Sequence, residues 1–153
     1  MNKIFAANWK MYLNEQESLD FVSKILSNKP LFLSNKVMIF PSHTAISSVK
    51  RALQNLPSIQ VGMQDCDIEM SGAVTGSNSI NSTFVDSCIV GHSERRTIFK
   101  EDEKIIKQKL ENSLNTVKST ILCIGETLEE KKQDETFKIL DKQLSILPSA
   151  LNG

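Results

Sequence analysis

Short, uninterrupted apolar runs alternate with amphipathic helical patterns along the whole chain, and this alternation most constrains the fold. The five runs are Ile4–Ala7, Val37–Phe40, Ile59–Met63, Cys88–Val90 and Thr120–Ile124. Continuous rather than alternating hydrophobicity is typical of strands that are buried on both faces. Strands and helices in regular succession indicate parallel pairing through helical crossovers. The sequence therefore predicts an α/β fold with five parallel strands alternating with helices.

The segments between these runs carry apolar residues three and four positions apart, which is typical of helices that bury one face. The four stripes consist of Leu19, Val22, Ile25 and Leu26; of Ile46, Val49, Ala52, Leu53 and Leu56; of Ile105, Ile106, Leu110, Leu114 and Val117; and of Phe137, Leu140, Leu144 and Leu147. A fifth, weaker helical pattern follows Gly76. Thr127 and Glu130 have the spacing of a capping box, which predicts that a helix begins there.

The length and charge of the chain limit the kinds of binding partner that we expect. The 153 residues suffice for one domain with its own core. The chain has 18 basic and 18 acidic residues, so no overall field attracts nucleic acid or a membrane surface. No apolar run approaches the roughly 20 residues that cross a membrane, and the N-terminus lacks a secretory signal pattern. We therefore expect neither a nucleic-acid nor a membrane partner.

The cysteines and histidines indicate a reducing compartment and no metal. Cys66, Cys88 and Cys123 are odd in number and widely spaced, and two of them fall inside apolar runs. This pattern is typical of reduced thiols in the cytoplasm rather than of a disulfide framework. His43 and His92 are the only histidines and no Cys-x-x-Cys pair accompanies them, so we expect no metal site. We also expect no cofactor.

Polar side chains follow two of the predicted strands. The segment 89–96 reads IVGHSERR and places His92 directly after an apolar run and a glycine. Near the N-terminus, Asn8 and Lys10 follow another such run. Strand ends can hold a cation, an amide and an imidazole in fixed positions, a set that suits a small anionic carbonyl compound. Residues 93–95 have the pattern of a short helix, whose N-terminal dipole would disfavour a positively charged His92.

Four motifs, spread in order over nearly the whole chain, resemble the triosephosphate isomerase family. They are ANWKM at residues 7–11, GAVTG at residues 72–76, VGHSERR at residues 90–96 and CIGETLEE at residues 123–130. Three positions depart from the family pattern: Asp65 stands where Asn is usual, Ser77 where Glu is usual and Lys100 where Gly is usual. None of these three residues is one to which the resemblance assigns chemistry.

The resemblance implies a (β/α)₈ TIM barrel, of which this chain is expected to hold five strands. Such a barrel needs about 250 residues. Residues 1–153 therefore read as a single partial TIM-barrel domain that is truncated before the sixth strand. The family's general base is a glutamate after the sixth strand, and it is absent from this chain, as are the lid and the phosphate-binding loops that follow it. We expect the chain to be inactive when it is alone.

The resemblance also implies an activity and a role for each motif residue. Family members interconvert dihydroxyacetone phosphate and glyceraldehyde 3-phosphate through an enediolate, in glycolysis and gluconeogenesis. His92 matches the family's electrophilic histidine, and Lys10 matches its catalytic and substrate-binding cation. Asn8 matches the substrate-binding amide, and Glu94 the carboxylate beside the lysine. Thr75 matches the tip of a loop that enters the second subunit of a homodimer.

Two other interpretations stay open. The chain could be a non-catalytic half-barrel protein, derived from the enzyme, that assembles with itself or with a partner. It could instead be another sugar-phosphate barrel enzyme, although the motifs around Lys10 and His92 are peculiar to the isomerase. Spacing alone nominates Glu126 as a base because it follows an apolar run and a glycine, whereas the resemblance makes it a structural carboxylate of the fifth loop.

Overall fold

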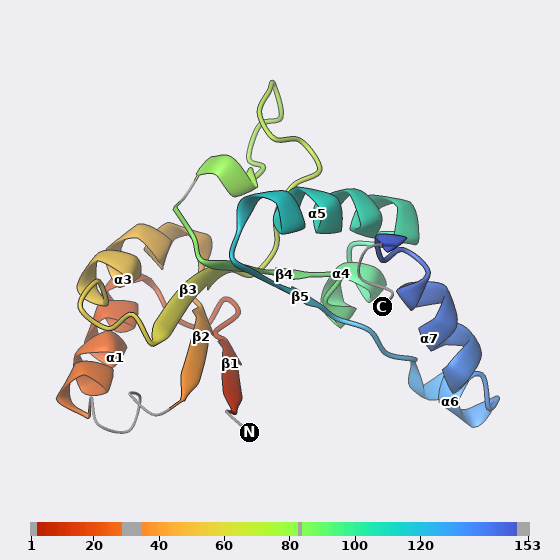
Figure 1. Ribbon diagram of the computed structural model, residues 1–153, viewed down its shortest axis with the longest axis horizontal. Coiled ribbons are helices and arrows are strands. Elements are labelled where there is room, and N and C mark those ends of the chain that lie inside the picture. Colours follow the sequence, from red (N-terminus) through yellow and green to blue (C-terminus); the bar gives the residue numbers. More distant parts are fainter. Residues whose placement is uncertain (1–2, 29–34, 83, 150–153) are drawn as a thin grey trace.

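The strands form one curled, open sheet, an incomplete TIM barrel. The structure is a computed structural model that describes residues 3–28, 35–82 and 84–149. All strand pairs are parallel, and the strands lie in the order β1-β2-β3-β4-β5. Their bounds are Ile4–Asn8 for β1, Lys36–Phe40 for β2, Ile59–Met63 for β3, Ser87–Val90 for β4 and Ser119–Leu122 for β5. The predicted parallel α/β fold is confirmed (Figure 1).

The helices lie along the outside of the curled sheet (Figure 1). Their bounds are Glu15–Ser27 for α1, His43–Ala45 for η1, Ile46–Ala52 for α3, Ile80–Ser82 for η2, Ser93–Thr97 for α4, Glu103–Thr116 for α5, Leu128–Lys132 for α6 and Thr136–Leu144 for α7. The weak pattern after Gly76 corresponds only to the 3-10 turn η2. The predicted capping box at the start of α6 is confirmed, since the Thr127 side chain accepts the N–H of Glu130 and the Glu130 carboxylate accepts the N–H of Thr127.

The sheet packs on both of its faces. On the outer face, side chains of β2, β3 and β4 form one apolar core with α1, α3 and α5. On the inner face, Met38, Phe40 and Ile89 form a second, smaller cluster. Gly62 faces this inner cluster, and a Cβ atom there would lie 2.5 Å from the Phe40 ring and 2.4 Å from the Ser87 hydroxyl. The ring of Phe40 therefore occupies the space that only a glycine leaves free.

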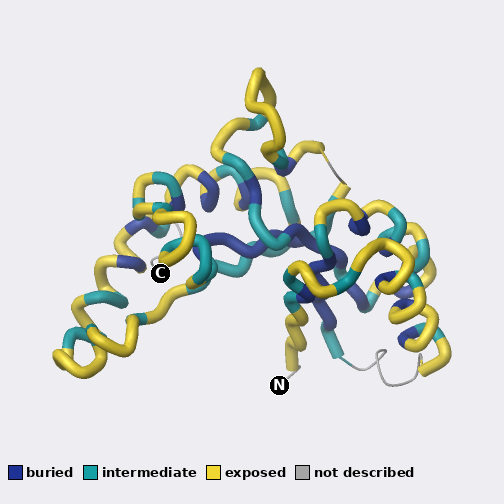
Figure 2. Tube along the Cα trace, turned by 180° about the vertical axis from the view of Figure 1, so that it is seen from behind, coloured by how far each residue is buried: buried dark blue, intermediate teal, exposed yellow. Residues whose placement is uncertain are grey.

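Burial on both faces is confirmed for β2, β3 and β4 but is wrong for the two edge strands. Ile4 and Phe5 of β1 are exposed, and all residues of β5 are only partly buried (Figure 2). Each edge strand has one hydrogen-bonded neighbour among the described residues. An apolar sequence makes a strand suited to burial, but the strand is buried only where other elements cover it.

The ends of some elements also differ from the prediction. The fifth strand ends at Leu122 rather than at Ile124. The helices α3 and α7 end at Ala52 and Leu144, before the last residues of their apolar stripes. The prediction that the stripe on α7 is buried is wrong for Phe137, which is 81% exposed. The spacing was helical, but the described residues provide no surface that covers this side chain.

Candidate functional site

The carboxyl ends of the strands surround an open cavity of about 540 Å³. Asn8 and Lys10 reach it from the end of β1, and His92 and Glu94 from the end of β4 and the start of α4. The structure thus brings together the four polar side chains that the sequence singled out at these two strand ends. Of these residues, Lys10 and Glu94 are 84 positions apart in the sequence.

Lys10 is held in an uncommon backbone conformation. Its φ angle is +54°, in the left-handed region that few residues other than glycine adopt. Its backbone N–H donates to the side-chain oxygen of Asn8 at 2.9 Å, and its ammonium donates to Glu94 at 2.7 Å. The asparagine in the motif therefore fixes the lysine that follows it, and the glutamate fixes the lysine's charged end.

The ion pair between Lys10 and Glu94 shifts both of their pKa values. The hydrogen bond to Glu94, followed by the charge of that carboxylate, raises the pKa of Lys10. The same hydrogen bond lowers the pKa of Glu94. The side chains remain 41% and 43% exposed, so water screens the pair and it adds little to stability. The pair keeps a cation at the cavity, where two further N–H groups of the ammonium remain for a ligand.

His92 forms the N-cap of α4, the short helix that the sequence predicted after it. Its Nδ1 atom accepts the backbone N–H of Glu94 at 3.3 Å, and a Glu94 carboxylate oxygen lies 3.4 Å from the same atom. A backbone N–H can only donate, so this contact requires a lone pair on Nδ1. A neutral His92 ring in this arrangement carries its proton on Nε2.

Arg96 holds α4 against the ends of two strands. Its guanidinium donates to the carbonyl oxygen of Gly91 at 2.8 Å and to that of Cys123 at 3.1 Å. Gly91 has a φ angle of +69°, and a Cβ atom there would lie 3.0 Å from the Arg96 guanidinium. A glycine before His92 is therefore required by both the backbone and the neighbouring arginine.

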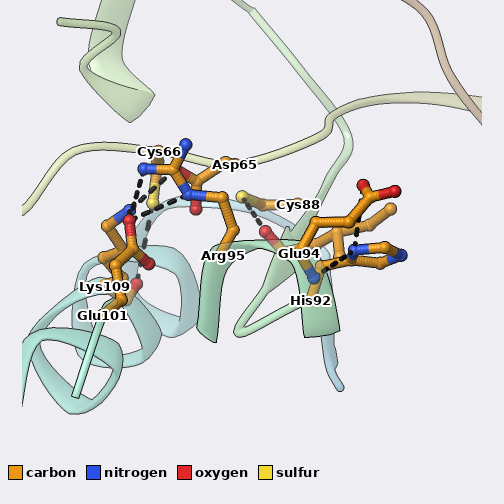
Figure 3. A network of polar contacts seen from close by, with 9 residues as sticks. Asp65, Cys66, Cys88, His92, Glu94, Arg95, Glu101 and Lys109 are labelled. Carbon is orange, nitrogen blue, oxygen red and sulfur yellow. Dashed lines mark hydrogen bonds and ion pairs between the residues drawn. The ribbon is translucent and has the colours of Figure 1, made fainter. Parts of the chain in front are cut away.

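A second group of charges, here called the buried cluster, lies next to the Lys10–Glu94 pair and consists of Asp65, Arg95, Glu101 and Lys109 (Figure 3); Asp65 and Arg95 also line the cavity. The Lys109 ammonium contacts Asp65 at 2.7 Å and Glu101 at 2.6 Å. Arg95 contacts the same two carboxylates. Burial, only partly offset by Lys109 and Arg95, raises the pKa of Asp65. One carboxylate oxygen each of Asp65 and Glu101 has no hydrogen-bond partner among the described residues.

Two other residues named from the sequence lie outside the cavity. Thr75 is exposed in the loop that projects from the sheet beyond β3, and it does not line the cavity (Figure 1). Glu126 accepts a hydrogen bond from Thr136 at 3.3 Å and does not line the cavity either. No group of three or more His, Cys, Asp or Glu within residues 3–28, 35–82 and 84–149 has an arrangement that could hold a metal ion. In the same ranges, no helix is both apolar and long enough to cross a membrane.

Sequence reasoning assigned no role to Gln64 or to the buried cluster. Gln64 lines the cavity and donates hydrogen bonds to the carbonyl oxygens of Lys10 and Phe40. Its position directly after an apolar run is the same signal that identified His92 and Lys10. Most of the buried cluster had no such signal, because Glu101 and Lys109 lie just before and within α5 rather than after an apolar run, and Lys109 is 44 positions from Asp65.

Five βα units in sequential order, with polar side chains gathered at the carboxyl ends of parallel strands, define a (β/α)-barrel protein. The chain belongs to the triosephosphate isomerase family, since the sequence model described as Triosephosphate isomerase matches residues 3–152.

Individual relatives agree with the family assignment. The triosephosphate isomerase of Bdellovibrio bacteriovorus is 35% identical over 95% of this chain and 61% of its own length. That of Aquifex aeolicus is 35% identical over 100% of this chain and 62% of its own length. The crystal structure of triosephosphate isomerase from Bartonella henselae superposes with a TM-score of 0.86 at 29% identity, over 97% of this chain and 63% of that one. The chain spans about three fifths of the length of these relatives.

Proposed function

We propose that this chain supplies the electrophilic half of a triosephosphate isomerase site, which interconverts dihydroxyacetone phosphate and glyceraldehyde 3-phosphate. The observation that carries the proposal is the placement of the Lys10 ammonium and the His92 ring on either side of Glu94 at one cavity. A phosphorylated triose offers an anion for the ammonium and a carbonyl oxygen for an N–H donor. The family assignment supports the same substrate.

The His92 Nε2–H acts as the electrophile in this mechanism. A base removes a proton from the carbon next to the carbonyl, and negative charge develops on the carbonyl oxygen. The N–H donor at His92 stabilises that oxygen, and the nearby Lys10 ammonium adds a positive charge. Asn8 keeps Lys10 in place through the 2.9 Å hydrogen bond. The former carbonyl oxygen then gains a proton while the adjacent hydroxyl loses its own and becomes the new carbonyl, and return of the first proton to the former carbonyl carbon completes the exchange of aldehyde and ketone.

The carboxylates of the cavity are poor candidates for the base. Glu94 is engaged by Lys10, and Asp65 by Lys109 and Arg95. Without a positioned base, proton abstraction loses a factor of about 10²–10⁴. We therefore propose that the 153-residue chain has negligible isomerase activity by itself. Turnover by the purified chain close to that of a full-length relative would contradict this.

We also propose that the site works in a cytoplasmic homodimer. Met11, Tyr12, Ile98 and Phe99 expose apolar surface at the rim of the cavity. Residues 72–76, the loop that holds Thr75, are exposed, project from the sheet and do not line their own cavity, so they are free to cover this rim in a second copy (Figure 1). All three cysteines are unpaired, which supports a reducing compartment. Sedimentation of the wild type and of Thr75→Arg tests the dimer, which the bulky charge should weaken.

The mechanism is tested with dihydroxyacetone phosphate labelled with ¹³C at its carbonyl carbon. We expect the carbonyl resonance to shift when the triose phosphate binds at millimolar concentrations, because His92 polarises the C=O bond. His92→Gln should bind with a smaller shift, and Lys10→Met should not bind measurably. Lys138→Met, which changes a distant exposed lysine, serves as the control. Binding that is equal in the wild type and in Lys10→Met would contradict the assignment.

One observation supports the second candidate function, a non-catalytic half-barrel. The inner face of the sheet already packs around Phe40, which is fully buried within the described residues. A half-barrel with a packed interior could serve as a folding or assembly unit without chemistry. A stable, soluble chain that binds no triose phosphate would favour this second function over the first.

A further inference from the structure

We infer that Gln64 is a positioning residue for Lys10, holding the lysine in the orientation that presents its ammonium to the cavity. The role of that ammonium rests on the proposed function, but the hold of Gln64 on Lys10 does not. Gln64 follows β3 directly, and its side chain reaches across the end of β2 to the end of β1.

The hydrogen bonds of Gln64 use its whole donor capacity. Its Nε2 atom donates to the carbonyl oxygen of Lys10 at 2.8 Å and to that of Phe40 at 3.0 Å. A side-chain amide has two N–H donors, so neither is left for a ligand. The carbonyl of Phe40 also accepts the backbone N–H of Trp9, the residue before Lys10. Gln64 therefore acts through the backbone around Lys10 rather than on a substrate.

The conformation of Lys10 gives this contact its importance. A φ angle of +54° is strained for a residue other than glycine, and it persists only where the surroundings impose it. The backbone N–H of Lys10 is held by Asn8, its carbonyl oxygen by Gln64 and its ammonium by Glu94. Of these three partners, Gln64 is the one at the end of β3, so it fixes Lys10 relative to a strand in the middle of the sheet.

The test compares Gln64→Met and Gln64→Glu with the wild-type chain. Methionine keeps the volume but has no donor, and an ionised glutamate keeps the shape but places a charge against two carbonyl oxygens. Gln60→Met is the matched control because Gln60 lies near the opposite end of the same strand, away from the cavity. The readout is the NMR titration of the Lys10 side chain, whose raised pKa reports its contact with Glu94.

We expect the Lys10 resonance to titrate like an ordinary exposed lysine in both Gln64 variants and like the wild type in Gln60→Met. Binding of dihydroxyacetone phosphate should weaken about tenfold in the same two variants. An unchanged Lys10 titration in a folded Gln64 variant overturns the inference. Loss of folding in both variants, with Gln60→Met folded, also overturns it, because Gln64 then serves the fold rather than Lys10.

The Lys10 titration tests the role of Gln64, and the binding of triose phosphate tests the proposed function. If the wild-type chain binds no triose phosphate, the proposed function fails for this chain, and the Lys10 titration still decides the role of Gln64. If the wild type binds and the Lys10 titration does not respond to the Gln64 variants, the inference fails while the proposed function stands.

Discussion

Two groups of charged side chains flank α4, and they differ in how far water reaches them (Figure 3). On the cavity side, the Lys10–Glu94 pair is about two-fifths exposed on each side chain. On the other side, the Lys109–Glu101 pair is 5% and 7% exposed. The contact distances are nearly equal, at 2.7 Å and 2.6 Å. The two ion pairs therefore have similar contact distances, and they differ in how far their side chains are exposed to water.

The comparison shows how one short helix serves two purposes. Glu94 and Arg95 are consecutive residues of α4. Glu94 pairs with Lys10 at the cavity, and Arg95, which also lines the cavity, pairs with Asp65 and Glu101 of the buried cluster. A buried charge is costly to leave without its partner, so the buried cluster resists rearrangement. An exposed pair breaks and re-forms at little cost, so Lys10 can turn from Glu94 to an anionic ligand. The rigid side holds α4 in place while the open side remains adaptable.

The largest effect is expected when Lys109 is replaced by Met in the buried cluster. The substitution leaves Asp65 and Glu101 with Arg95 as their only cation in the cluster, and breaking a buried pair in this way costs about 3–5 kcal/mol. Urea denaturation of the chain measures the loss. Lys107→Met, two positions earlier on the same helix at an exposed site, should change the midpoint little. A Lys109 variant as stable as the Lys107 control would show that the buried cluster does not anchor α4.

A smaller effect, visible mainly in its dependence on pH, is expected for Asp65→Asn. Burial raises the pKa of Asp65 in the folded chain, so the folded state binds this proton more tightly than the unfolded state. The wild type should therefore lose stability as pH rises from the ordinary aspartate pKa through the raised one. An asparagine side chain does not titrate, so the variant should gain stability relative to the wild type over the same window. Parallel curves of unfolding free energy against pH would contradict the burial of this carboxylate.

The sequence was sufficient for the features that depend on near neighbours. The presence of five strands, the helix at residues 93–97 and the capping box at Thr127 all follow from patterns a few residues long. The identity of the polar side chains at the cavity came from motifs at strand ends. Their roles remain predictions, although the structure places Asn8, Lys10 and His92 around one cavity.

Features that depend on distant contacts could not be predicted in this way. The exposure of Phe5 and Phe137 depends on whether another element covers them, which their own hydrophobicity does not reveal. The contact between Gln64 and Lys10 joins positions 54 residues apart. The pairing of Asp65 with Lys109 depends on how α5 crosses the sheet. Local sequence therefore predicts each helix and strand well, whereas the curvature of the sheet determines which distant side chains contact one another.

The smallest effect on stability, and the largest on the site, is expected for Lys10→Met. The pair it removes is exposed, so the urea midpoint should match that of the wild type and of the exposed control Lys138→Met. The pKa of Glu94 should rise toward its ordinary value because the hydrogen bond from Lys10 lowers it in the wild type. An NMR titration of the Glu94 carboxyl carbon measures this change. A marked loss of stability would mean that the open pair anchors the fold as the buried cluster does, and the contrast between the two sides of α4 would not hold.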